Sequence, residues 1–521
     1  MKKTNNLPFE IRKKGTSNSE LAASLADIAK NVTEFGVSES ASDNATSLTN
    51  AFNSGFKLIF PKGKQFKIQT PISITSKNID IDGNGATIVQ DFVSDTPIFQ
   101  FTTCDNLVIR NLKCTGNETY TAFAGADTKP NSFIKVVSSN NISIKSISVT
   151  QKSYAVIISS CSYSRVEDVT LQGVLTTYKT GANYSSCCRV ESGTNNILRG
   201  LIAKDCGTIS TSLSVTERLI VSDCVGENLQ DNGVYVSSGN QCIIKGIIVN
   251  GAANGMGVKV RGSYNEVFNC NVTGCQNGYS VTGNGLTPDS FGANGYGNII
   301  SNCIARNCLQ YGITASIQDN LYQRNVKITN NTLIDCATTG GSFSAILVQA
   351  NFAEITNNQI INCDGAYGIY IVGASGALTK ECHVVGNTLT DVLEGIRTVY
   401  VTRAIIKDNI VNTATTHAIE LRFTTDSLVN ENIGVENVTG NVVYCTSTYT
   451  NTGNTIRGNK GNTISVDSAT NTVMNNTPPT NDLKTAITSA PQYIGQVAKV
   501  GTITYISVGT ASTGDWIQVS N

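Results

Sequence analysis

Charged and aromatic residues of complementary chemistry gather between residues 189 and 261 of this 521-residue chain. Carboxylates can share the acid and base roles of glycosidic hydrolysis, cations hold acidic groups, and aromatic faces stack on sugar rings. Together these residue types predict a site for an anionic or heavily hydroxylated glycan. The candidate catalytic residues are Glu191, Glu227 and Asp231. The candidate substrate-binding residues beside them are Arg189, Asp223, Tyr235, Lys259 and Arg261.

A second group of the same residue types lies nearer the C-terminus and consists of Tyr370, Arg397, Glu420 and Arg422. We include Tyr370 and Arg397 among the substrate-binding candidates. Arg397 and Glu420 fall one sequence repeat apart, however. An ordinary ion pair between neighbouring strands is therefore the favoured interpretation of those two residues.

The sequence offers few residues for histidine-based catalysis or for metal binding. Only His383 and His417 are available for a histidine-based triad or a histidine metal site. Sixteen cysteines are present, but they fall into a structural repeat that explains them better than zinc binding does. We expect neither a metal nor another cofactor.

Elimination stays open as an alternative to hydrolysis. The loop SDCVGENLQDNG, residues 222–233, carries three carboxylates that could cluster around a calcium ion, as in pectate lyase chemistry. In that case Lys259 or Arg261 would take the C5 proton of a uronate, and Tyr235 would assist.

These residues are placed by a repeat of short apolar strands that runs from about residue 58 to about residue 470. Runs with period-2 alternation, interrupted by Gly and Asn, indicate strands. A repeat of roughly 20 to 35 residues with several such strands indicates a solenoid. One strand column contains AVII (155–158), CCRV (187–190), SLSV (212–215), GVYV (233–236), GVKV (257–260) and GYSV (278–281). A second column places asparagines in register at Asn331, Asn358, Asn387, Asn409, Asn432 and Asn459.

Strand alternation predicts which side chains of the first column face outward. The third letter of each phrase should face solvent, and so should the residue that follows the final aliphatic. This places Ile157, Arg189, Ser214 and Tyr235 in one outward file, with Thr216 in its companion.

The predicted fold class is all-β, a right-handed, single-stranded parallel β-helix of roughly a dozen coils. Coils about 4.8 Å apart would stack like residues on one another, with asparagines at the turns and reduced cysteines inside. We expect an N-terminal lead and capping helix over 1–35 and the β-helix over 36–475, where carbohydrate is bound and cleaved. A small C-terminal β-rich module over 476–521 would serve trimerisation or carbohydrate contact.

The charge balance and hydropathy exclude several partners. Lys+Arg and Asp+Glu both number 38, which indicates neither a nucleic-acid nor a membrane partner. No run of eighteen or more apolar residues predicts a membrane span, and no basic stretch followed by an apolar run predicts a signal peptide. We expect synthesis in a host cytoplasm without a signal peptide.

The start of the repeat, residues 32–89, resembles the entry of the pectate-lyase-like β-helix superfamily. The usual Gly-Asp-Gly-x-x-Asp-Asp phrase is replaced here by SESASDN, residues 38–44. The resemblance implies a carbohydrate-active β-helix with a short capping helix. The matching features are Phe35-Gly36, Asp43, the helix-like stretch 44–53, Pro61-x-Gly63 and the turn Asp82-Gly83-Asn84-Gly85.

The segment after Pro478-Pro479 resembles the C-terminal segment of tailspike depolymerases from phages of capsulated bacteria, Acinetobacter phages especially. The shared pattern is Y-I-G-Q-V…Y-I-S-V-G-T-A-S-T-x-D-W, which includes the chain's one tryptophan, Trp516. The resemblance implies a homotrimeric phage or prophage tailspike that depolymerises bacterial capsular or other surface polysaccharide, more by hydrolysis than by elimination. Its location would be the virion tail, attached through a tail or adaptor protein. The rival functions are a pectate-lyase-type enzyme and a non-catalytic receptor-binding fibre.

Overall fold

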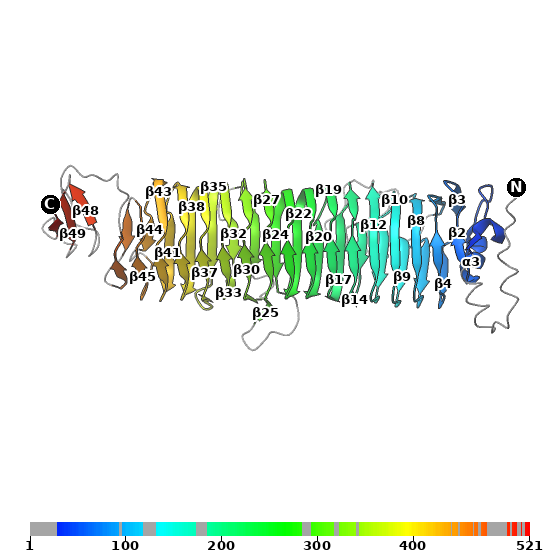
Figure 1. The fold of residues 1–521 in the computed structure, drawn as a ribbon, viewed down its shortest axis with the longest axis horizontal. Helices are drawn as coiled ribbons and strands as arrows, with labels where there is room; N and C mark the ends of the chain where they lie inside the picture. The colour runs from blue at the N-terminus through cyan, green and yellow to red at the C-terminus, as the bar shows by residue number, and fades with distance from the viewer. Residues whose placement is uncertain are drawn as a thin grey trace, which may run out of the picture. The chain divides into compact units, whose positions relative to one another are not determined.

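The computed structural model is built of β-strands, with one α-helix, α3 (Ala45–Asn53), among the residues that it describes (Figure 1). Contacts divide the chain into two compact units. Unit 1 comprises Met1–Ser214 with Leu219–Cys224, and unit 2 comprises Val215–Arg218 with Val225–Asn521. The described residues are 29–92, 96–117, 132–172, 185–283, 293–316, 322–339, 343–438, 440–445, 449–461, 463–466, 470–476, 497–500, 503–507, 512 and 516–520.

Unit 1 is built from coils whose strands pair in parallel with the equivalent strands of the next coil, in three files. File A consists of β1 (Ala29–Asn31), β2 (Lys57–Ile59), β5 (Asp80–Asp82), the first parts of β8 (Val108–Thr115), β10 (Ser143–Thr150) and β12 (Arg165–Gln172), then β15 (Ile197–Arg199) and β18 (Ile220–Ser222). File B consists of β3 (Gln65–Ile68), β6 (Thr87–Gln90), the second parts of β8, β10 and β12, and β16 (Ile202–Lys204). File C consists of β4 (Ile72–Thr75), β7 (Phe99–Thr102), β9 (Ser132–Val137), β11 (Tyr154–Ser159), β13 (Ser186–Val190) and the start of β17 (Thr208–Glu217), with β14 (Gly193–Thr194) beyond β13.

Unit 2 repeats the same three files. File A consists of β21 (Ile243–Lys245), β23 (Glu266–Phe268), β26 (Ile299–Ser301), β30 (Lys327–Thr329), β34 (Glu354–Thr356), β37 (His383–Val385), β39 (Ile405–Lys407), β42 (Leu428–Asn430), β45 (Thr455–Arg457) and β47 (Thr472–Met474). File B consists of β19 (Val225–Leu229), β27 (Ile304–Arg306), β31 (Thr332–Ile334), β40 (Ile410–Ala414), β43 (Ile433–Val438) and the first parts of four long strands that continue into file C. File C consists of those strands, β22 (Ile248–Ser263), β24 (Asn271–Thr282), β35 (Gln359–Val372) and β38 (Thr388–Thr402), together with β20 (Val234–Asn240), β28 (Tyr311–Ser316), β32 (Ser344–Val348), β41 (Ile419–Thr425), β44 (Val443–Cys445) and β46 (Ile464–Val466).

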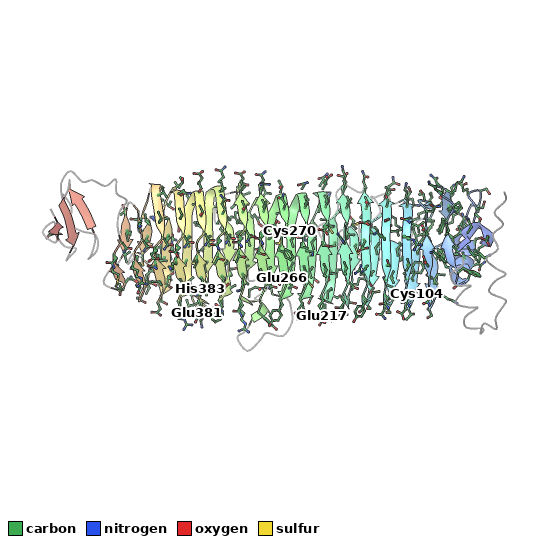
Figure 2. The ribbon with its side chains drawn as sticks, in the orientation of Figure 1. Cys104, Glu217, Glu266, Cys270, Glu381 and His383 are labelled. Carbon is green, nitrogen blue, oxygen red and sulfur yellow. The ribbon has the colours of Figure 1, made fainter. Side chains whose placement is uncertain are left out.

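The interior of each unit is filled by the residues that alternate inward along the strands. In β34, Ile355 is buried between two partly exposed neighbours, as the period-2 pattern predicts. All sixteen cysteines are free and buried, so the predicted internal, reduced stackers are confirmed; Cys104 and Cys270 are labelled in Figure 2. Burial raises the pKa of Cys206 and of Cys382 to about 12, so these thiols stay protonated and packed.

A ladder of buried asparagines joins consecutive coils of unit 2 at the bend between files A and B. The backbone N–H and the side-chain amide of each member both donate to the side-chain oxygen of the next, at 2.8–3.1 Å. The preceding residue, such as Asn330, has φ of 57°, a left-handed conformation that asparagine tolerates. The prediction is confirmed, and the ladder extends one coil further; its members are Asn331, Asn358, Asn387, Asn409, Asn432, Asn459 and Asn476.

The glycines that open the file C phrases are required by the close approach of neighbouring coils. A Cβ atom at Gly233 would lie against the carbonyl oxygen of Gly257, and one at Gly278 against that of Gly312. A larger residue would therefore push adjacent strands apart.

The helix predicted over 44–53 is present as α3. Asp43 precedes its N-cap, Asn44, and its Oδ1 accepts from the backbone N–H of Ala45, the first helical residue, at 2.9 Å. Phe52 is buried and meets the ring of Phe99 edge to face, at 5.5 Å between centroids. The helix therefore packs on file C of unit 1. Of the predicted N-terminal lead and capping helix over 1–35, residues 1–28 lie outside the described residues.

Several details of the sequence-based fold prediction are wrong. The coils number about 16, not roughly a dozen. The additional coils include short ones such as that from Thr455 to its register partner Thr472, which the repeat alignment did not resolve. The phrase 212–215 was also misaligned, because Arg189 pairs with Thr211 rather than with Ser214.

The misalignment arose because the interior of β17 is polar. Ser210, Ser212 and Thr216 are buried there, while Val215 is 51% exposed, so hydrophobicity marked the wrong face. Thr216 is thus inward, contrary to prediction. Ile157 occupies the predicted file as the register partner of Arg189, but it is fully buried.

The C-terminal segment contains an antiparallel sheet of β48 (Val497–Val500), β49 (Ile503–Ser507) and β50 (Trp516–Ser520). A further parallel sheet in unit 2 joins β25 (Ala293–Tyr296), β29 (Tyr322–Arg324) and β33 (Ala350–Asn351), and β36 (Thr379–Lys380) pairs with β38. In the described part of the chain, no helix has the length and apolar character needed to cross a membrane.

Candidate functional site

Arg189 and Glu191 lie at the end of β13, where file C of unit 1 turns side chains outward. The Arg189 Nε lies 3.4 Å from Glu191 Oε1, and its Nη1 donates to the Tyr154 hydroxyl at 3.1 Å. Lys135, from two coils earlier, places its Nζ 3.9 Å from Glu191 Oε2. Because the Glu191 side chain is still 24% exposed, this carboxylate between two cations is accessible to a ligand.

Asp223 follows β18, at the bend after file A of unit 1. Its Oδ2 lies 3.1 Å from the Nε of Arg199, and both side chains are exposed. The structure therefore places Asp223 in a surface ion pair on file A, whereas Arg189 and Glu191 belong to file C of the same unit.

Tyr235, Lys259 and Arg261 lie on neighbouring strands of file C in unit 2. Tyr235 and Lys259 are register partners, and the Lys259 Nζ lies 5.4 Å from the centroid of the Tyr235 ring. The Arg261 Nε donates to the carbonyl of Gly283 at 3.3 Å. The structure thus brings the predicted cation and the predicted aromatic platform together.

Glu227 and Asp231 flank the bend from file B to file C in unit 2, and their environments differ. Burial raises the pKa of Asp231, an effect that hydrogen bonds from Asn232 and the charge of Lys259 only partly offset. Glu227, on β19, is exposed. A buried carboxyl with a raised pKa suits an acid role, and an exposed carboxyl suits a role in contact with water.

The second predicted group forms a compact ionic network on file C of unit 2. Arg397 and Glu420 are register partners on β38 and β41, and Arg397 Nη2 lies 2.6 Å from Glu420 Oε2. This confirms the predicted ion pair. Arg422 Nε lies 2.8 Å from Glu420 Oε1. Glu394, which the sequence analysis missed, accepts from Arg397 at 3.1 Å (Nε) and 2.6 Å (Nη2).

Aromatic rings surround this network. The Arg397 guanidinium lies 4.1 Å from the centroid of the Tyr367 ring, and the Tyr367 ring is 5.1 Å from that of Tyr370. The Arg422 guanidinium lies 4.6 Å from the Tyr449 ring. His417 and Tyr444 stack with their centroids 4.3 Å apart. The sequence held a signal for Glu394, because it stands before the glycine of EGIR as Tyr367 stands before the glycine of YGIY, and the two residues are register partners.

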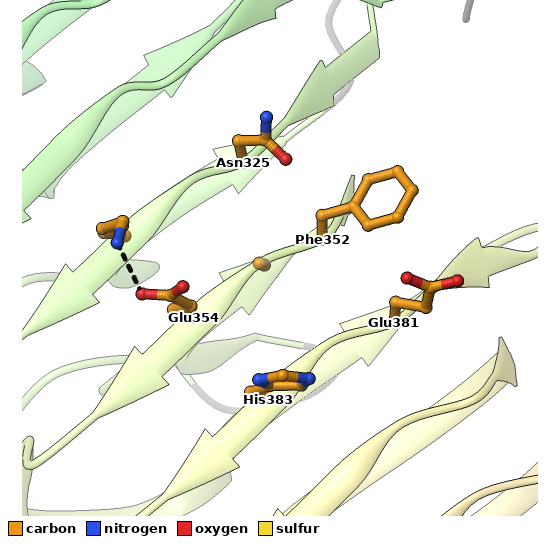
Figure 3. A pocket seen from close by; sticks show the side chains of 7 residues that line it. Asn325, Phe352, Glu354, Glu381 and His383 are labelled. Atoms are coloured by element: carbon orange, nitrogen blue, oxygen red, sulfur yellow. Dashed lines mark ion pairs between the residues drawn. The ribbon is translucent and has the colours of Figure 1, made fainter.

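A groove of about 370 Å³ lies on a different face of unit 2, over file A and the bends that lead into it (Figure 3). Phe352, Glu381 and His383 line it, and Glu381 and His383 are also labelled in Figure 2. Glu354, the register partner of His383, lies 2.9 Å from Lys327 Nζ. The sequence analysis missed this groove, because bend residues such as Phe352 and Glu381 do not follow the strand period.

Comparison with solved structures identifies the fold. A double mutant of the tailspike protein of E. coli bacteriophage HK620 matches with a TM-score of 0.50 at 12% identity, over 89% of this chain and 81% of that chain. The chain has a tailspike-like parallel β-helix. The same phage protein in complex with a pentasaccharide is similar with a TM-score of 0.47, at 12% identity and the same coverage.

Sequence comparisons add one partial match. The pattern of a family described as "Periplasmic copper-binding protein (NosD)" matches residues 310–493, about a third of this chain. No curated protein sequence matches the chain. The part of the chain that the structure describes contains no group of three or more His, Cys, Asp or Glu residues that could hold a metal ion. The described residues therefore do not fit a copper site of that kind.

Proposed function

We propose that the protein is a phage or prophage tailspike that binds and depolymerises a bacterial surface polysaccharide, specifically a capsular polysaccharide. The observation that carries this proposal is the arrangement in unit 2, where Asp231, with a raised pKa, precedes a strand that presents Tyr235 against Lys259. A carboxyl whose pKa is raised by burial, a sugar-stacking ring and a cation are groups that glycosidic cleavage uses. The tailspike-like fold agrees with it.

Hydrolysis assigns a distinct role to each candidate carboxyl. Asp231, whose pKa is raised by burial, would donate a proton to the leaving glycosidic oxygen. Glu227 would activate water or attack the sugar within the same unit, and Glu191, held between Lys135 and Arg189, is the equivalent candidate on unit 1. Arg189, Tyr235, Lys259 and Arg261 would bind the chain of sugars.

The test is incubation of the purified protein with capsules from a panel of bacterial strains, following reducing ends and absorbance near 235 nm. New reducing ends without absorbance support hydrolysis, and both signals together support a lyase. Binding with neither signal identifies a non-catalytic receptor-binding fibre and overturns the enzymatic proposal. The absence of binding to any polysaccharide overturns the tailspike proposal.

Assembly belongs to the same proposal. A tailspike is expected to be a homotrimer attached to the virion through a tail or adaptor protein, with the C-terminal β-sheet as a candidate trimerisation module. Light scattering on the purified chain should give three times the 55.3 kDa mass of one chain. A monomer at micromolar concentration would contradict this part of the proposal.

A further inference from the structure

The ionic network on file C of unit 2 is built on two buried carboxyl groups. Glu394 is 1% exposed and Glu420 is 2% exposed, and the two lie on adjacent coils. Arg397 bridges them, since its Nη2 is 2.6 Å from an oxygen of each. Arg397 Nη1 also donates to the Tyr367 hydroxyl. The carboxyl groups therefore hold the guanidinium of Arg397 in one orientation, and Glu420 also forms an ion pair with Arg422.

The proton balance of the network leaves it cationic. Burial raises the pKa of Glu394 to about 8, and the neighbouring Glu420 adds to the rise, although Arg397 opposes it. The pKa of Glu420 is lowered despite burial, because of hydrogen bonds from Arg422 and Glu394. At pH 7 the two guanidinium groups thus face one carboxylate. One positive charge of the network is left uncompensated.

The other titratable groups around Glu394 do not cancel this charge. Burial lowers the pKa of His417, which precedes β41, so this imidazole is neutral at pH 7. Burial raises the pKa of Tyr370, on β35, so its hydroxyl stays protonated. Tyr367 from the same strand contributes its hydroxyl as the acceptor from Arg397. Arg422 on β41 is already counted.

The side of the network that remains accessible has the composition of an acidic-sugar site. The Arg422 side chain is 29% exposed and that of Arg397 is 13% exposed, in contrast to the two buried carboxyl groups beneath. Tyr370 and Tyr449 are partly exposed beside them. Paired guanidinium groups suit a carboxylate, and flanking rings suit the apolar face of a pyranose.

We propose that Arg397 and Arg422 form a subsite for a carboxylate-bearing sugar of the polysaccharide, framed by tyrosines and oriented by buried Glu394 and Glu420 as positioning residues. The inference rests on the proposed function, because it names the class of sugar that the glycan-binding face would recognise. It also has a consequence that a merely structural ion pair lacks. Deprotonation of Glu394 above about pH 8 adds a negative charge behind the guanidinium groups, so affinity for the acidic sugar falls as pH rises.

A direct binding experiment tests the subsite without requiring cleavage. The probes are a tetramer of galacturonate and the same tetramer after carboxyl reduction, titrated into the full-length protein by calorimetry at pH 6.5 and pH 9. We expect binding of the acidic tetramer at pH 6.5, about tenfold weaker binding at pH 9 and weaker binding of the reduced tetramer. Failure of the acidic tetramer to bind, or equal affinity for both tetramers, overturns the proposal.

Two variants separate the subsite from a structural network. Arg422→Gln should weaken binding of the acidic tetramer at least tenfold. The control is Arg457→Gln, at an exposed arginine on β45, which should leave this affinity unchanged. Glu394→Gln keeps a neutral, hydrogen-bonding side chain, so the ratio of its affinities at pH 6.5 and pH 9 should lose the decline seen in the parent. A decline that persists in Glu394→Gln overturns the positioning role. Cleavage of capsules is measured independently, so depolymerase activity can fail while uronate binding holds, and the reverse.

Discussion

The side-chain oxygen of Asn387 accepts two hydrogen bonds from Asn358, one from its backbone N–H and one from its side-chain amide, each 2.9 Å long. Asn387 in turn donates its side-chain amide to the carbonyl of Ile355 at 2.9 Å. All of these groups are buried, so each hydrogen bond replaces one that water would otherwise make. A missing partner therefore costs the desolvation of the groups left behind.

Replacement of one rung tests that account. Asn387→Ala leaves the donors of Asn358 and the carbonyl of Ile355 unpaired and should destabilise the protein by about 1–3 kcal/mol. Chemical denaturation followed by circular dichroism measures the loss. Asn357→Gly is the matched control, because Asn357 is exposed with φ of 55° and glycine adopts that conformation freely. Equal stability of the two variants would contradict a stabilising ladder.

Removal of the candidate catalytic carboxyl groups should separate cleavage from binding. The variants Asp231→Asn, Glu227→Gln and Glu191→Gln are made singly. We expect at least one of them to lower the cleavage rate by about 10²–10⁴-fold while capsule binding persists. Reducing-end release and a pull-down on immobilised capsule provide the two readouts. Glu266→Gln, an exposed carboxylate on β23, is the control. Full cleavage by all three variants would show that the catalytic groups lie elsewhere.

The raised pKa of Glu394 predicts how stability depends on pH. The folded state holds this proton up to about pH 8, whereas an unfolded glutamate releases it near the ordinary glutamate pKa of 4.5. Because the folded state binds more protons between these values, the contribution of this group to stability is full below about pH 4.5 and is lost as pH rises toward 8. The melting temperature of the wild type should therefore fall between pH 6 and pH 8 by more than that of Glu394→Gln. Parallel curves for the two proteins would contradict the assignment.

Buried thiols predict chemical inertness. The chain's sixteen cysteines are free and buried, and burial raises the pKa of several of them. A thiol reagent should therefore label far fewer than one cysteine per chain in the native protein at pH 8, and all sixteen in denaturant. Rapid labelling of the native protein would indicate open coils or an exposed cysteine.

The elements that could be predicted from sequence are those repeated in every coil. The asparagine ladder, the inward cysteines and the register of Tyr235 with Lys259 follow from period and alternation, because stacking places like residues on one another. The register at β17 failed because serine and threonine replace the apolar residues inside. That substitution removes the hydrophobic contrast on which alignment depends.

The parts of the candidate sites that escaped prediction lie at bends or take their chemistry from surroundings. Phe352 has φ of 56° at the bend before file A, where no repeating pattern marks which way a side chain points. The repeat marks the position of Glu394 in EGIR, but not its protonation state. The raised pKa of this residue arises from burial and from the neighbouring Glu420, which only three-dimensional packing reveals.

The asparagine ladder separates what holds the coils together from what a ligand would touch. Its rungs bond inward to one another and to backbone carbonyls, and none depends on the identity of an outward-facing file C residue. Substitutions on the outer wall should therefore cost little in folding stability. Such a scaffold would let the proposed glycan-binding face change while the coils stay joined.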